Sequence, residues 1–213
     1  MDWLEVTKIS CGFDADHIRE LINFVETSIK NCLKDLEEFS SEYENKHPEV
    51  ISVHGNPYLD DYWQISEIFT QKLRYSVLVT IYSYFEAYTK NMCERYSSYY
   101  NTISFKKIYG STIERSRIFY DKLMKIEIPG QLEKSGSLEF ICNVRNDIVH
   151  NEGKASTKVI EAINNNQIDI HRVLINPNKT LALHSEFLLW AIDEAHLCIE
   201  FIINNIINKK INL

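Results

Sequence analysis

Apolar residues recur every three or four positions along most of this 213-residue chain, and that spacing constrains its fold more than any other feature. Residues three and four apart lie on one face of an α-helix, so each such stretch predicts a helix with one buried side. The first predicted helix begins at Asp14 or Asp16, either of which can cap it, and reaches about Tyr43. Its apolar positions are Ile18, Leu21, Ile22, Val25, Ile29, Leu33, Leu36, Phe39 and Tyr43.

Four further segments show the same periodicity: residues 60–98, residues 111–125, residues 137–153 and the stretch from Ser185 onward. Pro129 and Gly130 close the third helix, and Gly153 is a natural C-cap for the fourth. The second helix has a predicted core stripe of Leu73, Val77, Ile81, Phe85, Tyr88 and Met92. The last helix should direct inward Leu188, Ile192, Ala195, Ile199, Ile202, Ile203 and Ile206.

Before the last helix the periodicity changes from helical to alternating, at Ile168, Ile170, Val173 and Ile175 and again at Leu181 and Leu183. A turn-forming Asn-Pro-Asn run at 176–178 separates the two parts, so a short β-hairpin is predicted. The sequence therefore predicts an all-α, up-and-down helical bundle of about five long helices with a small β-hairpin before the C-terminal helix. We expect one domain over residues 1–213, with an N-terminal helical extension over 1–58 and the core bundle over 59–213.

The composition, 45% hydrophobic and 25% charged, is typical of a soluble globular protein. The N-terminus has no basic region followed by an apolar run, so we expect no signal peptide. The longest uncharged apolar stretch, Tyr75 to Phe85, is too short to span a bilayer. Five scattered cysteines without a Cys-x-x-Cys pair suit reduced thiols. These features predict a cytoplasmic protein that does not enter the membrane.

A run of polar residues interrupts the fourth helical pattern near its end, from Val144 to Gly153. Arg145 supplies a permanent cation whose planar fork suits phosphate. The unperturbed pKa of a histidine such as His150 lies near neutrality, so this side chain can carry protons. Asn146 precedes His150 by four residues, which places the two on nearly one face of a helix. Together these side chains suit phosphodiester chemistry.

This motif resembles that of the HEPN superfamily, small helical-bundle ribonucleases in which an Arg is followed four to six residues later by a His. Arg145, Asn146 and His150 match it position by position, and the resemblance covers about residues 70–205. It implies metal-independent cleavage of single-stranded RNA, in which the 2′-hydroxyl attacks the adjacent phosphorus and leaves 2′,3′-cyclic phosphate and 5′-hydroxyl ends. His150 would then be the general base or acid, and Arg145 would stabilise the phosphorane. Asn146 would orient the phosphate or fix the His150 rotamer.

The resemblance also implies a toxin or phage-defence effector, with an antitoxin or another defence protein as a candidate partner. Some related toxins carry a Tyr two residues beyond the His, which a nucleotidyltransferase-type antitoxin modifies; here that position is Glu152, which argues against this form of control. Five residues of helix rotate by about 500°, so Arg145 and His150 point roughly 140° apart. We therefore expect a homodimer in which two motif helices form one composite site, as family members do.

Two accessory residues have open interpretations. Glu86 lies within an apolar span, either at a solvent boundary or in an ion pair with Arg145. Asp147 is either an auxiliary hydrogen-bonding residue or a solvated side chain. No His-x-x-x-His spacing and no Gly-rich phosphate loop occur, so we expect neither a metal nor a nucleotide cofactor.

The net charge of −7 argues against a general nucleic-acid coat, but the charge is uneven: residues 1–74 carry −8 and residues 75–150 carry +2. Cations in the middle third include Lys106, Lys107, Arg115 and Arg117. These side chains form either a solvated helix face or an RNA-phosphate track beside the motif. Two rival functions also remain: a catalytically idle HEPN-like dimerisation or scaffold module, and a nucleotide-binding regulatory domain in which Arg145 grips a phosphate.

Overall fold

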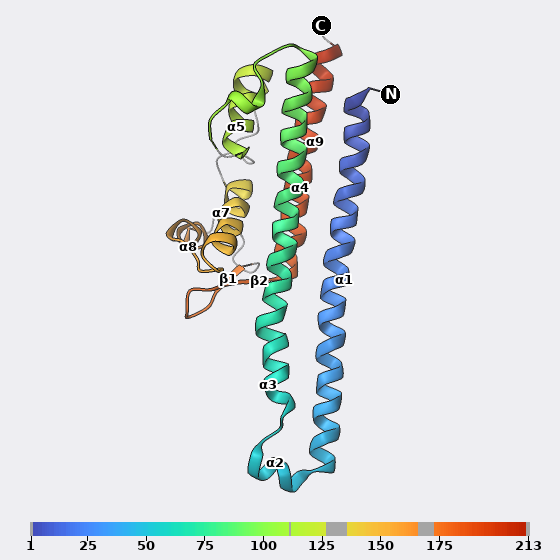
Figure 1. Ribbon diagram of the computed structural model, residues 1–213, viewed down its shortest axis with the longest axis vertical. Helices are drawn as coiled ribbons and strands as arrows, with labels where there is room; N and C mark the ends of the chain where they lie inside the picture. Colours follow the sequence, from blue (N-terminus) through green and yellow to red (C-terminus); the bar gives the residue numbers. More distant parts are fainter. Residues whose placement is uncertain (1, 111, 127–135, 166–172, 212–213) are drawn as a thin grey trace.

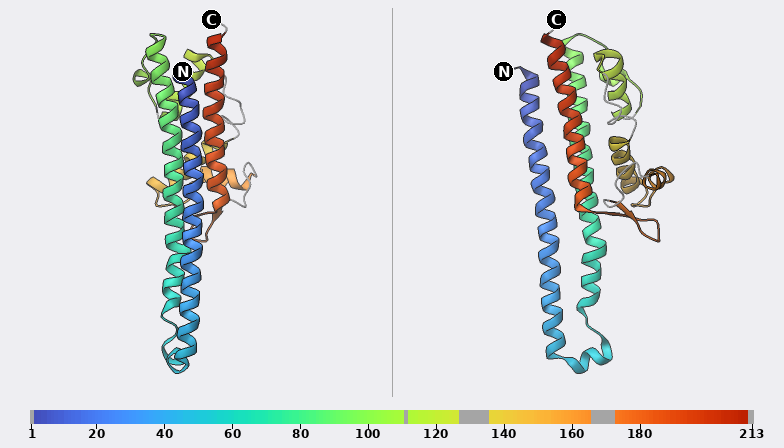
Figure 2. Two further views of the ribbon diagram at one scale, coloured as in Figure 1. Left: turned by 90° about the vertical axis from the view of Figure 1, so that its right-hand side faces the viewer. Right: turned by 180° about the vertical axis from the view of Figure 1, so that it is seen from behind.

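Three long helices form the body of the molecule: α1 (Trp3–Lys46), α4 (Thr70–Tyr99) and α9 (Ser185–Ile211) (Figure 1). The computed structural model describes residues 2–110, 112–126, 136–165 and 173–211. α4 and α9 run side by side, and α1 packs antiparallel to both (Figure 2). The predicted all-α bundle with a small hairpin before the C-terminal helix is confirmed.

Shorter elements join these helices. α2 (Pro48–His54) turns the chain after α1, and α3 (Tyr58–Trp63) continues through a π-helical segment, η1 (Gln64–Phe69), into α4. After α4 come a 3₁₀ turn, η2 (Phe105–Lys107), then α5 (Thr112–Ile118) and a second π-helical segment, η3 (Phe119–Met124). α7 (Ser137–His150) and α8 (Thr157–Asn164) follow. The predicted breaks at Pro129 and Gly130 lie outside the described residues.

The first helix begins at Trp3, well before the predicted starts at Asp14 and Asp16, so that boundary was wrong. The physical reason is packing: Leu4, Cys11 and Ala15 are fully buried, as are Ile18 and Ile22 further along the same helix. One glycine, Gly12, lies within this part of the helix and weakens it slightly. The burial of the apolar side chains outweighs that effect. Residues of the predicted N-terminal extension thus contribute to the same core as α4 and α9.

The stripe on α4 is buried as predicted at Val77, Ile81, Phe85 and Met92, but Leu73 is 44% exposed. Leu73 lies at the edge of the three-helix part, at the level where α9 begins at Ser185. The two-strand hairpin before it ends on α4, because Leu183 exchanges hydrogen bonds with the Gln71 side chain.

The β-hairpin is antiparallel, with β1 (Val173–Ile175) paired to β2 (Leu181–Leu183) in the register Val173 to Leu183. This agrees with the predicted turn at 176–178; the predicted strand positions Ile168 and Ile170 lie outside the described residues. α8, which precedes the hairpin, was not predicted, because its eight residues offer too few turns for a clear period. The hydroxyl of Tyr75 on α4 donates to the carbonyl of Leu181, which fixes the hairpin to the bundle.

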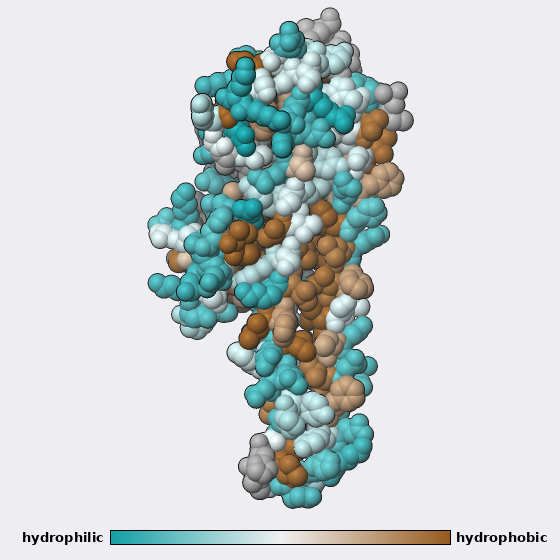
Figure 3. Space-filling model, viewed as in Figure 1, coloured by the Kyte–Doolittle hydropathy of each residue, from teal (hydrophilic) through white to brown (hydrophobic). Residues whose placement is uncertain are grey.

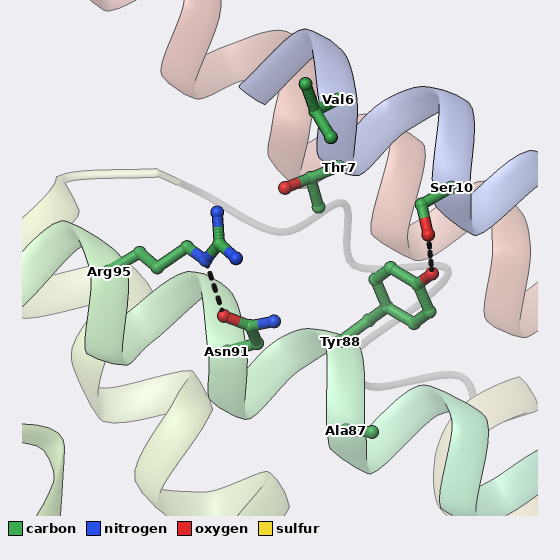
Figure 4. A pocket seen from close by; sticks show the side chains of 7 residues that line it. All are labelled: Val6, Thr7, Ser10, Ala87, Tyr88, Asn91 and Arg95. Carbon is green, nitrogen blue, oxygen red and sulfur yellow. Dashed lines mark hydrogen bonds between the residues drawn. The ribbon is translucent and has the colours of Figure 1, made fainter. Parts of the chain in front are cut away.

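Polar contacts complete the seam between the beginning of α1 and the end of α4. Ser10 and the hydroxyl of Tyr88 are 2.9 Å apart (Figure 4). Tyr88 also donates to Asp14 at 2.6 Å. Arg95 Nε donates to Asn91 beside a small hollow of about 160 Å³. This hollow is too small for most organic ligands.

All five cysteines are free thiols, as the scattered spacing predicts. Burial raises the pKa of Cys11 to about 11 and that of Cys93 to about 12, so these two thiols stay protonated. Among the described helices, none combines the length and the apolar character that crossing a membrane requires.

Candidate active site

The motif helix α7 is held by its apolar face. Phe140, Ile141 and Val144 are buried, and α7 packs against α4 and α9. Arg145 lies about 100° around the helix from the buried Val144, at the border of the buried side, and Asn146 lies about 200° from it, on the opposite side. Both side chains are half-buried. His150 is the last residue of α7 and is exposed.

Arg145 is oriented by two neighbours. Its guanidinium lies over the ring of Tyr82 on α4, with 4.9 Å between Cζ and the ring centroid. Its Nη1 donates to Oδ1 of Asn146 at 2.9 Å. Nε is buried and has no hydrogen-bond partner among the described residues. The cation is therefore fixed in position while part of its hydrogen-bonding capacity is unused.

Tyr82 and Cys142 extend this cluster, and sequence reasoning missed both. The Tyr82 hydroxyl lies 3.5 Å from Sγ of Cys142, and the Asn146 amide donates to the same sulfur at 3.6 Å. Desolvation, the contact with Cys142 and the charge of Glu86 raise the pKa of Tyr82 far above its ordinary value, so the phenol stays protonated. Cys142 could have been found from its helical spacing, since it precedes Asn146 by four residues; Tyr82 carried no such signal.

The hypothesis of an ion pair between Glu86 and Arg145 is wrong. The described ion pairs do not include these two residues, although both lie in described parts of the chain. Glu86 is half-buried, one turn beyond Tyr82, and its charge acts on that phenol. The aromatic ring and Asn146 already hold the guanidinium, which removes the need for a carboxylate partner.

Asp147 is buried, with 3% of its surface exposed, so the alternative of a solvated side chain is wrong. Its carboxylate accepts from the backbone N–H of Ser156 at 2.7 Å and from the amide of Asn151 at 3.0 Å. Its backbone carbonyl accepts from the N–H of Gly153 at 2.9 Å. Asp147 is therefore a hydrogen-bonding residue, and its partners show that it fixes the turn from α7 to α8.

His150 borders an open hollow of about 510 Å³, which is also lined by Asn151, Glu152, Lys154, Ala155 and Ser156. His150 is exposed, and none of the described hydrogen bonds or ion pairs uses its imidazole. Lys154 adds a cation here that sequence reasoning missed. The hollow can accept a phosphate group beside an imidazole.

The structure brings Arg145 together with Asn146 but not with His150. Arg145 faces Tyr82, whereas His150 borders a hollow that Arg145 does not line. Asn146 bonds to Arg145 and Cys142, and no described hydrogen bond joins it to His150. Within one chain, the predicted cation and proton carrier thus serve different surfaces, as their helical angle predicts.

The four predicted RNA-binding residues lie on η2 and α5. Lys106, Lys107 and Arg117 are exposed, and Arg115 packs over the ring of Phe105 with 5.1 Å between Cζ and the centroid. α5 lies toward the end of the bundle that holds the C-terminus, whereas α7 ends at the hairpin (Figures 1 and 2). The length of α7 therefore lies between α5 and His150, and the role of these cations in RNA binding stays a prediction.

Within the described ranges, no group of three or more His, Cys, Asp or Glu side chains is placed to hold a metal ion. Comparisons with protein-family models, with curated proteins and with solved structures gave no match. The function must therefore be inferred from the contacts and the chemistry of this chain's own residues.

Proposed function

We propose that this chain is a metal-independent endoribonuclease of HEPN type, a toxin or phage-defence effector that acts in the cytoplasm as a homodimer. The observation that carries the proposal is the state of the two motif residues. Arg145 is oriented by Tyr82 and Asn146, yet its Nε lacks a partner, and His150 is exposed at an open hollow. A cation fixed in advance stabilises developing charge at little cost of reorganisation.

In this proposal the RNA supplies its own nucleophile. His150 takes the proton of a 2′-hydroxyl, whose oxygen attacks the adjacent phosphorus and expels the 5′-oxygen of the next nucleotide. The products are a 2′,3′-cyclic phosphate and a 5′-hydroxyl, and a protonated His150 can return a proton to the leaving oxygen. Arg145 neutralises the charge on the phosphorane oxygens while Asn146 holds the guanidinium.

The separation of Arg145 and His150 supports the dimer. Arg145 of a single α7 faces Tyr82 whereas His150 borders the hollow beside Lys154, which disfavours contact of one phosphate with both side chains of the same chain. Two motif helices related by a two-fold axis would place the Arg145 of one chain opposite the His150 of the other. Each half-site would then contain one cation and one proton carrier.

A second candidate function is a catalytically idle dimerisation or scaffold module. The contacts of Arg145 favour it: a guanidinium stacked on a buried ring and bonded to its neighbour is also what a structural cation would show. The two functions differ in a single observable, which is whether purified protein cuts RNA.

The test incubates purified protein with a single-stranded RNA in EDTA, next to a DNA of the same sequence. We expect RNA fragments with 2′,3′-cyclic phosphate and 5′-hydroxyl ends, and no cleavage of the DNA. The His150→Ala variant should lose roughly 10²–10⁴-fold in rate. His17→Ala, which removes another exposed helical histidine, is the matched control and should keep full activity. Activity that EDTA abolishes and Mg²⁺ restores would refute the metal-independent mechanism, and no cleavage of any RNA would favour the scaffold.

A further inference from the structure

α1 extends far beyond the three-helix part of the bundle (Figure 1). At its 44 residues it is about 66 Å long, whereas α9 has 27 residues and starts midway along the molecule. Beyond the start of α9, only α2, α3 and η1 accompany the second half of α1. We call this two-helix projection, residues 30–69, the arm.

The arm has no apolar core of its own. The buried residues of α1 end at Ile29, and neither α3 nor η1 has a buried residue. The contacts between its two sides include hydrogen bonds, in which Asn56 donates to Oγ of Ser40 at 2.6 Å and to Glu44 at 2.8 Å, and Tyr62 donates to Glu37 at 3.2 Å. One edge-to-face ring pair, Tyr43 with Tyr58, adds to them. Helices obtain most of their stability from packing an apolar face, so this projection needs more apolar burial than it makes.

Large apolar side chains of the arm are instead exposed. The exposed fraction is 60% at Leu59, 56% at Trp63, 41% at Ile68, 54% at Phe69 and 55% at Phe39. Leu59 and Trp63 are four residues apart on α3, and the π-helical segment, which bonds residues five apart, keeps Ile68 in line with Trp63. On the face seen in Figure 3, the larger apolar surface lies over the three-helix part, and the arm is mostly hydrophilic with scattered apolar patches. Leu59, Trp63 and Ile68 nevertheless form an exposed apolar stripe on the arm. A stripe of this kind marks an interaction site for a helix.

The arm also carries most of the negative charge. Residues 30–69 contain three Lys and nine Asp or Glu, a net charge of −6, against −7 for the whole chain. Three of these acids, Asp60, Asp61 and Glu67, are exposed on the same α3–η1 segment as the apolar stripe. Pairing two arms would bring together two surfaces of −6 each, which repel one another. Charge complementarity therefore favours a cationic partner over a second copy.

We propose that the arm docks a basic amphipathic helix of a partner protein. The partner helix lays its apolar side on Leu59, Trp63, Ile68 and Phe69 and sets Lys or Arg side chains against the flanking carboxylates. The product is a three-helix segment that continues the bundle and supplies the apolar burial that the arm lacks. This interaction is independent of RNA cleavage, because the arm and the motif lie in different parts of the molecule (Figure 1).

The probe is a fluorescein-labelled 21-residue peptide of three heptads, with Leu at the two core positions and Lys at the flanking positions. Fluorescence anisotropy measures its binding to the full-length protein. Two control peptides are used: one has the same composition in scrambled order, and the other has Glu in place of every Lys. We expect the heptad Lys peptide to bind at least tenfold more tightly than either control, and more weakly as salt rises. Hydrogen exchange should slow within residues 58–69 when it binds.

The decisive variant is Trp63→Ser with Phe69→Ser, which should weaken binding at least tenfold. Both side chains are more than half exposed, so the fold should persist, and circular dichroism checks this. Phe13→Ser with Leu197→Ser, at exposures of 63% and 55% outside the arm, is the matched control and should bind normally. Equal binding of the scrambled peptide, or of the Trp63 and Phe69 variant, would overturn the proposal. A dimer in sedimentation that only that variant dissociates would also overturn it, by assigning the arm to a second copy.

Discussion

The guanidinium of Arg145 on α7 stacks on the ring of Tyr82 on α4, with 4.9 Å between Cζ and the ring centroid. Tyr82 is 5% exposed, so the ring is a fixed part of the core and not a mobile surface group. The position of the motif cation thus depends on how α7 packs on α4. This relationship makes Tyr82 a positioning residue for the proposed chemistry.

Two substitutions of Tyr82 distinguish the contribution of its ring from that of its hydroxyl. Tyr82→Phe keeps the ring under Arg145 and loses only the contact with Cys142, so RNA cleavage should stay near the wild-type rate. Tyr82→Leu removes the cation–π contact, worth about 0.5–2 kcal/mol, and should lower kcat roughly 3- to 30-fold with a smaller change in KM. Steady-state kinetics and thermal melts on both variants provide the check. If kcat of the folded Leu variant is unchanged, the ring has only a structural role.

Asp147 should contribute strongly to stability. Asp147→Ala leaves the N–H of Ser156 and the amide of Asn151 without their acceptor, and the free energy of unfolding should fall by roughly 2–4 kcal/mol. Urea denaturation measures this change. Asp121→Ala, at an exposed position, is the control and should stay within about 0.5 kcal/mol. Equal effects of the two substitutions would contradict the assigned hydrogen bonds.

Two effects oppose a side chain at Gly153, the backbone conformation and a close neighbour, and comparison with Gly55 separates them. Its φ is +80°, and an added Cβ would lie 2.6 Å from the Tyr75 hydroxyl oxygen, which is bonded to Leu181. Gly55 has a φ of +75° but nothing within 4 Å. Gly55→Ala should therefore cost about 1 kcal/mol from the backbone alone, and Gly153→Ala about 2–4 kcal/mol from backbone and overpacking together. Denaturation measures the loss of stability in each variant. Equal losses would mean that Tyr75 moves away from the added Cβ without cost, and would contradict the predicted overpacking.

Periodicity was enough to predict the helices and the hairpin but not the ends or partners of each element. Val77, Ile81 and Phe85 are buried as their spacing predicts, whereas Leu73 in the same stripe is 44% exposed at the edge of the three-helix part, where α9 begins. The start of α1 and the shift of register in the π-helical segments depend on tertiary packing, which a single period does not describe.

The candidate site shows the same division. The motif placed Arg145, Asn146 and His150 on one helix, and α7 begins at the predicted Ser137 but ends at His150, three residues before the predicted cap at Gly153. Its spacing could not show that Arg145 would meet Tyr82, since that contact arises when α7 packs on α4. Sequence spacing does not describe this packing, and for the same reason the predicted ion pair between Glu86 and Arg145 was wrong.

Lys106 and Lys107 remain predicted RNA contacts even though α7 separates them from His150. Reversal of both charges to Glu should reduce the slope of log affinity against log salt by about 1.4, at about 0.7 for each lost phosphate contact on a single strand. Cleavage of bound RNA should keep its rate. Filter binding at several salt concentrations measures the slope, with Lys30→Glu and Lys34→Glu on the exposed side of α1 as the control pair. An unchanged slope would show that η2 is only a solvated surface.

The most direct test of the central claim mixes two inactive chains, Arg145→Ala and His150→Ala, after each is shown to be folded and dimeric. If each phosphate contacts Arg145 from one chain and His150 from its partner, both substitutions fall in one half-site of a mixed dimer and the other half-site stays intact. With equal amounts and random exchange, half of the dimers are mixed, so cleavage should return to about a quarter of the wild-type rate. Cleavage that stays at the level of the separate variants, although mixed dimers are shown to form, would contradict the composite ribonuclease site.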